Sequence, residues 1–167
     1  MKIAIATTLV TLAFGAAAVS AAPMATPADR AFVAKVSQGG MFEVAAGKLA
    51  ETKGSTQDVR DFGTTEVHDH MLVGAKLKRI STSEGVMFSA TPNAEFAGKL
   101  AHLNGLSGTA FDAAYLTEMA ALHDADGAAF LTESTNGGSA AYRAFGTETH
   151  RIVQRHIGAI KGAPLPQ

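Results

Sequence analysis

The sequence contains no cysteine and no tryptophan among its 167 residues, and only 7% of them are aromatic. The absence of cysteine excludes a disulfide scaffold, zinc sites with thiolate ligands, a thiol nucleophile and a lipid anchor attached through a cysteine. Lys and Arg (14) nearly balance Asp and Glu (15), so the chain lacks the basic excess of nucleic-acid binders. It also lacks the motifs of serine hydrolases, dinucleotide-binding enzymes, phosphate-binding loops and zinc proteases. These absences favour a protein that is not an enzyme.

The first 21 residues have the pattern of a secretory signal peptide. Lys2 gives a positive start, and the segment from Ile3 to Val19 is apolar or small and uncharged. Small residues then lead to Ala21, where we expect cleavage. The mature protein is therefore expected in the periplasm, with secretion or peripheral attachment to the envelope left open. No later stretch reaches the ~20 apolar residues that a transmembrane helix needs, so the mature chain is expected to have no such helix.

Apolar residues that recur with the period of an α-helix predict four long helices in the rest of the chain. Their expected ranges are 27–53, 56–84, 109–134 and 139–161, and the connection over 85–108 is expected to carry a short helix at 94–103. The other connections are short, so helices one and two, and three and four, should form antiparallel hairpins. The predicted fold class is all-α: a ferritin-like four-helix bundle with two antiparallel hairpins and one long crossover.

The length fits a single domain. The predicted organisation is a signal peptide (1–21), a short leader (22–27), the bundle domain (28–161) and a C-terminal tail (162–167). Ser55 with Asp58, and Thr109 with Asp112, have the spacing of capping boxes and predict two of the helix starts.

Glycine is unusually frequent inside the predicted helices. Because small residues let two helix backbones approach closely, we interpret these glycines as packing positions rather than hinges. They are Gly39, Gly40, Gly47, Gly63, Gly74, Gly127, Gly146 and Gly158.

All four long helices carry ionisable residues where the helical pattern would place an apolar one. With a rise of about 1.5 Å per residue, all of them fall in the middle third of their helices. Buried ionisable groups need partners, so this shared depth indicates that they meet in the core. The candidate site residues are Glu43, Glu66, His70, His123, Asp126 and His156.

Two interpretations of this group stay open. As a hydrogen-bonded network, the side chains would satisfy one another. As a metal site, they would hold Fe, Mn, Zn or Cu, since bundle cores are where carboxylate and histidine metal sites are built. The chain has no Glu-x-x-His motif, the usual di-iron pattern, and Glu66 and His70 are one residue too far apart for it. The network is therefore favoured, and His68 is predicted to face solvent, away from His70.

Short motifs along the chain occur in an order that resembles one bacterial family. They are Phe32–Lys35, Gln38–Val44, Gly47–Ala50, Val59–Phe62, Asp69-His70, Leu106–Gly108, Phe111-Asp112, Tyr115, His123 and His156. Over residues of about 28–160 the chain is similar to the domain-of-unknown-function family 4142. The resemblance implies an exported protein with a ferritin-like helical bundle, and it implies no established activity. At Arg151 the chain departs from the family, in which proline is common.

The favoured function is an exported, non-catalytic binding module or an envelope or stress-protective module. The alternative is a ferritin-like metal-binding or metal-dependent redox protein that uses the Glu and His cluster. A carrier of a small apolar ligand is a third hypothesis, because a bundle lined by Gly and Ala can leave a cavity. We expect no nucleic-acid partner, and a homo-oligomer or an envelope protein partner remains compatible with the sequence.

Overall fold

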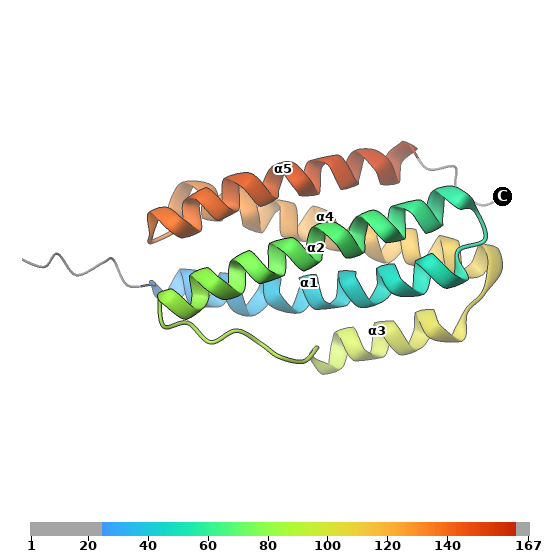
Figure 1. The fold of residues 1–167 in the computed structure, drawn as a ribbon, viewed down its shortest axis with the longest axis horizontal. Coiled ribbons are helices and arrows are strands. Elements are labelled where there is room, and N and C mark those ends of the chain that lie inside the picture. The colour runs from blue at the N-terminus through green and yellow to red at the C-terminus, as the bar shows by residue number, and fades with distance from the viewer. Residues whose placement is uncertain (1–24, 163–167) are drawn as a thin grey trace, which may run out of the picture.

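The computed structural model describes residues 25–162, which form helices joined by turns and one longer connection (Figure 1). The helices are α1 (Pro27–Lys53), α2 (Gln57–Ser83), α3 (Ala94–Gly105), α4 (Gly108–Asn136) and α5 (Ala140–Gly162). The predicted all-α class and the helix ranges are confirmed to within a few residues. The predicted signal peptide, residues 22–24 of the leader and residues 163–167 of the tail lie outside the described residues.

The four long helices form two antiparallel hairpins, α1 with α2 and α4 with α5. The hairpins pack through α1 against α4 and through α2 against α5. The connection that leaves α2 returns along the bundle, and α3 within it lies on α1 and α4 (Figure 1). This is the bundle with one long crossover that the sequence predicts.

Two buried aspartates, each from the opposite hairpin, bind the two tight turns. Asp112 on α4 accepts hydrogen bonds from the backbone N–H and the hydroxyl of Ser55 between α1 and α2. Asp29 on α1 accepts one from the N–H of Gly138 between α4 and α5. Burial acts to raise the pKa of Asp29, but hydrogen bonds from Gly138 and Thr26 lower it below its ordinary value. Each turn is thus held by the carboxylate of a residue that lies far away in the sequence.

The capping boxes predicted at Ser55 and Thr109 are wrong. The N-cap of α2 is Thr56, whose hydroxyl accepts a hydrogen bond from the N–H of Val59. Helix α4 begins already at Gly108, before Thr109. Asp112 is therefore one turn inside the helix, where it binds the other hairpin's turn instead of its own helix end.

The two hairpins are repeats of one another. Identical residues recur at one constant offset along the chain: Asp29 and Asp112, Gly54 and Gly137, Arg60 and Arg143, Phe62 and Phe145, and Gly63 and Gly146. The paired residues also play equal parts, since each arginine donates a hydrogen bond to the carbonyl of its paired glycine, at 2.6 and 2.7 Å. Because each aspartate reaches the other hairpin's turn, the repeats are related by a quasi-twofold axis.

Glycines bring the helices of each hairpin into close contact, as predicted, at Gly47, Gly63 and Gly146. A Cβ atom added at Gly63 would lie 2.7 Å from the Cβ of Ala50 and 2.8 Å from the carbonyl oxygen of Gly47. The packing interpretation is wrong for Gly40, Gly74 and Gly158, where an added Cβ would meet nothing within 4 Å.

Replacing Gly63 by alanine is expected to destabilise the protein by about 2 kcal/mol, because backbone on both sides must move apart. The matched control is Gly158→Ala on the exposed surface of α5, which is expected to be neutral or stabilising by up to ~1 kcal/mol through helix propensity. Urea unfolding of both variants measures the difference. Equal unfolding midpoints for the two variants would show that the α1–α2 contact is not as tight as described.

The apolar core consists of two clusters, one toward each end of the bundle. In the first, the ring of Phe32 packs edge-on against Phe130 and Phe145, at centroid distances of 5.5 and 6.3 Å. In the second, Phe111 stacks on Tyr115 at 5.8 Å. Buried ionisable side chains from α1, α2, α4 and α5 share the interior of the bundle with these clusters.

Candidate metal centre

Five of the six predicted site residues converge at mid-bundle: Glu43 from α1, Glu66 and His70 from α2, His123 from α4 and His156 from α5. Each is at most 3% exposed. Glu66 lies at the centre, because one of its oxygens is 2.9 Å from Nδ1 of His156 and 3.3 Å from Nε2 of His123. Its other oxygen is 3.2 Å from Nε2 of His70. One carboxylate thus faces three imidazoles that come from three helices.

Each imidazole uses its remaining nitrogen to donate a hydrogen bond away from the centre. The acceptors are the Glu43 carboxylate for Nδ1 of His70 (2.8 Å), the Met119 carbonyl for Nδ1 of His123 (2.7 Å) and the Asp69 carboxylate for Nε2 of His156 (3.0 Å). Because a carbonyl oxygen only accepts, Nδ1 of His123 carries a hydrogen. In the neutral rings, the nitrogens that face Glu66 are then the ones with free lone pairs. An outer acceptor behind each histidine is the usual arrangement around a bound metal.

The inward-facing atoms gather around a common centre. The three nitrogens and one oxygen of Glu66 all lie within 4.8 Å of each other. Neither oxygen of Glu66 nor Nε2 of His70 has an aligned hydrogen-bond partner among residues 25–162, despite the short distances. Nε2 of His123 and Nδ1 of His156 are 3.0 Å apart and form a hydrogen bond when one of them carries a proton, whereas two neutral lone pairs at that distance would repel. The described side chains therefore form a network in which both oxygens of Glu66 and Nε2 of His70 lack aligned hydrogen bonds.

The carboxylates of the cluster strongly favour positive charge on the imidazoles. Burial lowers the pKa of His70, but the carboxylates of Glu43 and Glu66 outweigh it and raise this pKa to about 10. The pKa of His123 is raised as well, against burial, by its close contact with Glu66 and by the charge of Glu43. Conversely, the three histidines hold the pKa of Glu66 below its ordinary value although burial opposes them. Either protons on the histidines or a bound metal cation can supply this positive charge.

The donor set fits a divalent transition metal. Neutral imidazole nitrogens suit Zn, Cu, Fe and Ni, and a carboxylate oxygen completes a mixed nitrogen and oxygen environment. Glu66, His70, His123 and His156 could each supply one ligand atom. Glu43 and Asp69 would then orient His70 and His156 from behind, and the Met119 carbonyl would orient His123.

Some histidines and one predicted site residue lie outside this group. The side chain of His68 is 71% exposed, which confirms the prediction that it faces solvent away from His70. His102 is exposed on α3, and His150 bonds the carbonyl of Gly127. Asp126 is buried nearby, but it is not among the four residues whose ligand atoms meet.

Sequence reasoning missed two outer partners, Asp69 and Met119. Asp69 follows Glu66 by three residues and so shares its helix face, which is the signal that could have identified it. Met119 acts through its backbone carbonyl, and no side-chain pattern could reveal that.

Comparisons with known proteins place the chain. The sequence model of the family described as "Domain of unknown function (DUF4142)" matches residues 14–162. The fold is similar to the crystal structure of a DUF305 fragment from Deinococcus radiodurans, with a TM-score of 0.73 and 15% identity over 84% of this chain and 97% of that chain. No curated protein matches the chain, and no helix within residues 25–162 is long and apolar enough to cross a membrane. The chain belongs to the DUF4142 family.

Proposed function

We propose that this protein is an exported helical bundle that binds one transition-metal ion through Glu66, His70, His123 and His156. The observation that carries the proposal is the convergence of buried ligand atoms from α2, α4 and α5, among which both oxygens of Glu66 and Nε2 of His70 lack aligned partners among the described residues. Export to the periplasm is supported by the N-terminal sequence pattern alone.

The orientation of the three imidazoles favours a metal over a proton network. A network held together by protons would align its short contacts as hydrogen bonds, and the contacts of Glu66 with the histidines are not so aligned. Each imidazole instead directs its outer nitrogen to an acceptor behind it and turns its inner nitrogen toward Glu66. When bound, the metal would supply a Lewis-acid or redox centre at the middle of the bundle.

A binding or protective role fits this site better than catalysis. Three nitrogens and one oxygen would give a metal four protein ligands, the number found in structural zinc sites, whereas catalytic zinc keeps one position for water or substrate. All four side chains are also almost fully buried. If the metal accepts a further ligand beyond these four side chains, metal-dependent redox chemistry is the alternative function.

Elemental analysis of the chain from Ala22 onward, purified without a His tag or a chelator, tests the proposal. We expect about one metal ion per chain after reconstitution with one of Fe, Mn, Zn or Cu. His123→Ala should lose it, because one of four ligands is gone, and His102→Ala on α3 should keep it. If none of the four ions is retained above the level of His123→Ala, the proposal fails.

A further inference from the structure

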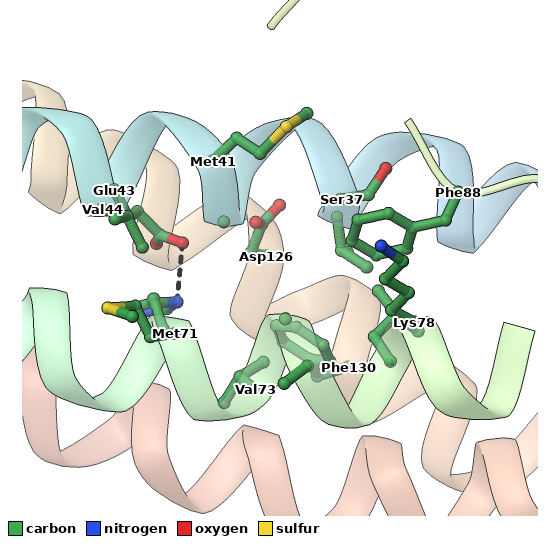
Figure 2. A pocket seen from close by; sticks show the side chains of 16 residues that line it. Ser37, Met41, Glu43, Val44, Met71, Val73, Lys78, Phe88, Asp126 and Phe130 are labelled. Carbon is green, nitrogen blue, oxygen red and sulfur yellow. Dashed lines mark ion pairs between the residues drawn. The ribbon is translucent and has the colours of Figure 1, made fainter. Parts of the chain in front are cut away.

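A cavity of about 270 Å³ opens between α1 and α2 beside the metal centre (Figure 2). This volume is close to the lower end for small-molecule sites, about 300 Å³. Its walls are mainly apolar, from Val36, Val44, Val73, Leu77, Phe88 and Phe130. Glu43 and His70 also line it, so the cavity reaches the outer shell of the histidine cluster.

The internal repeat explains why this space is hollow. At the constant offset that relates the hairpins, Gly40 corresponds to His123 and Val73 corresponds to His156. Where the second hairpin has two imidazoles, the first hairpin has a hydrogen atom and a short apolar side chain. An added Cβ at Gly40 would meet nothing within 4 Å. The cavity is thus the quasi-symmetric counterpart of the space that the two imidazoles fill.

Two acidic side chains give the cavity a polar end. Glu43 and Asp126 correspond to one another in the repeat, both line the cavity, and they are 2% and 3% exposed. Figure 2 shows the Asp126 carboxylate between α1 and α2, next to the Glu43 carboxylate that pairs with His70. Oε1 of Glu43 and Oδ1 of Asp126 have no hydrogen-bond partner among the described residues. These are two buried acceptors without donors beside an apolar space.

The nearby lysines leave the Asp126 carboxylate without a hydrogen-bond donor. Lys35 lies 3.8 Å from it, but the side chain of Lys35 is 51% exposed and donates its hydrogen bond to the carbonyl of Ala125. Lys78 lies with Phe88 at the end of the cavity away from Glu43 (Figure 2). Burial and the charge of Glu43 raise the pKa of Asp126 to about 7, although Lys35 and the histidines act in the other direction.

We propose that this cavity binds a small organic ammonium, whose amine donates hydrogen bonds to Asp126 and Glu43 and whose apolar body packs between α1 and α2. Charge-assisted hydrogen bonds to buried carboxylates give the specificity, and the apolar walls exclude water. The proposal stands on the cavity and its two acceptors, so it holds whether or not a metal occupies the neighbouring cluster.

Benzylamine titrated into the full chain from Ala22 onward, followed by amide shifts in ¹⁵N NMR spectra, tests this. We expect shifts at the cavity residues of α1 and α2 and around Asp126, and at least tenfold tighter binding than for benzoate. Asp126→Asn should weaken benzylamine binding about tenfold, which corresponds to the loss of about 1.4 kcal/mol. Gly40→Leu should abolish it by filling the cavity, and Gly158→Leu on exposed α5 should leave it unchanged.

Three results would overturn the proposal: equal affinity for benzoate, undiminished affinity of Gly40→Leu, or no shifts at millimolar benzylamine. Undiminished binding by Asp126→Asn would overturn the recognition by the acidic pair. The spectra show whether each variant is folded, and the metal content of the same samples is measured separately. Failure of the metal centre and failure of the cavity are therefore distinguished.

Discussion

Replacing Glu66 by glutamine is expected to lower the free energy of unfolding by about 3 kcal/mol and to abolish metal binding. Glu66 is fully buried and contacts three imidazoles. Glutamine keeps the shape but removes the negative charge, which leaves positively charged or metal-bound histidines without their central partner. Urea unfolding and competition with a chromophoric chelator measure the two effects.

The matched control for Glu66→Gln is Glu148→Gln on α5. Glu148 pairs with Lys76 at the surface, where its side chain is 59% exposed. Exposed ion pairs contribute at most about 1 kcal/mol, so this variant should unfold close to wild type and retain metal. A Glu66→Gln protein that unfolds like Glu148→Gln and still binds metal would remove Glu66 from the centre of the site.

The stabilisation by a bound metal ion is expected to be larger at pH 8 than at pH 5.5. A metal competes with protons for the imidazole nitrogens, so its binding strengthens as pH rises. In metal-free protein the pKa of His70 is raised to about 10. The stability that protonated His70 contributes is therefore complete below its ordinary pKa of 6.5 and is lost as pH rises through about 10. Metal-free protein should lose stability over the range in which the metal-loaded protein gains it.

Melting temperatures with and without each of Zn, Mn, Fe and Cu, at both pH values, measure this effect. At a thousand times its dissociation constant, a ligand adds about 4 kcal/mol. Glu133 also titrates in this range, because burial and Asp29 raise its pKa to about 7. The stability that its protonated form contributes is lost as pH rises through that value. The difference between loaded and metal-free protein at each pH removes this background. A metal-induced shift that is no larger at pH 8 than at pH 5.5 would contradict proton competition.

The helices and their pairing could be predicted because they follow from local information. Apolar periodicity sets the long helices, and short connections such as Gly54-Ser55 force antiparallel hairpins. The helix caps could not be predicted in the same way. Ser55 is bound by Asp112, which lies more than fifty residues away in the sequence, and a local capping rule cannot anticipate such a contact. The internal repeat was present in the sequence and would have linked Asp29 with Asp112.

The sequence predicted how far along their helices the site residues lie, but not which way their side chains point. Helix rise placed Glu66, His70 and His123 at one level, and the structure brings them together. Asp126 has a similar depth but faces the cavity beside the cluster instead of its centre. The choice between a hydrogen-bonded network and a metal site depends on which nitrogen of each ring donates outward. That choice is made by Asp69, whose spacing from Glu66 is its sequence signal, and by the Met119 carbonyl, for which no side-chain pattern exists.

X-ray absorption at the metal edge of the reconstituted protein tests the central claim most directly, because it counts the ligands around the ion. We expect three imidazoles and one carboxylate oxygen at about 2.0–2.2 Å for zinc, with one imidazole fewer in His156→Ala and no change in His102→Ala. A shell made only of oxygen atoms, or one with no more than a single imidazole, would contradict it.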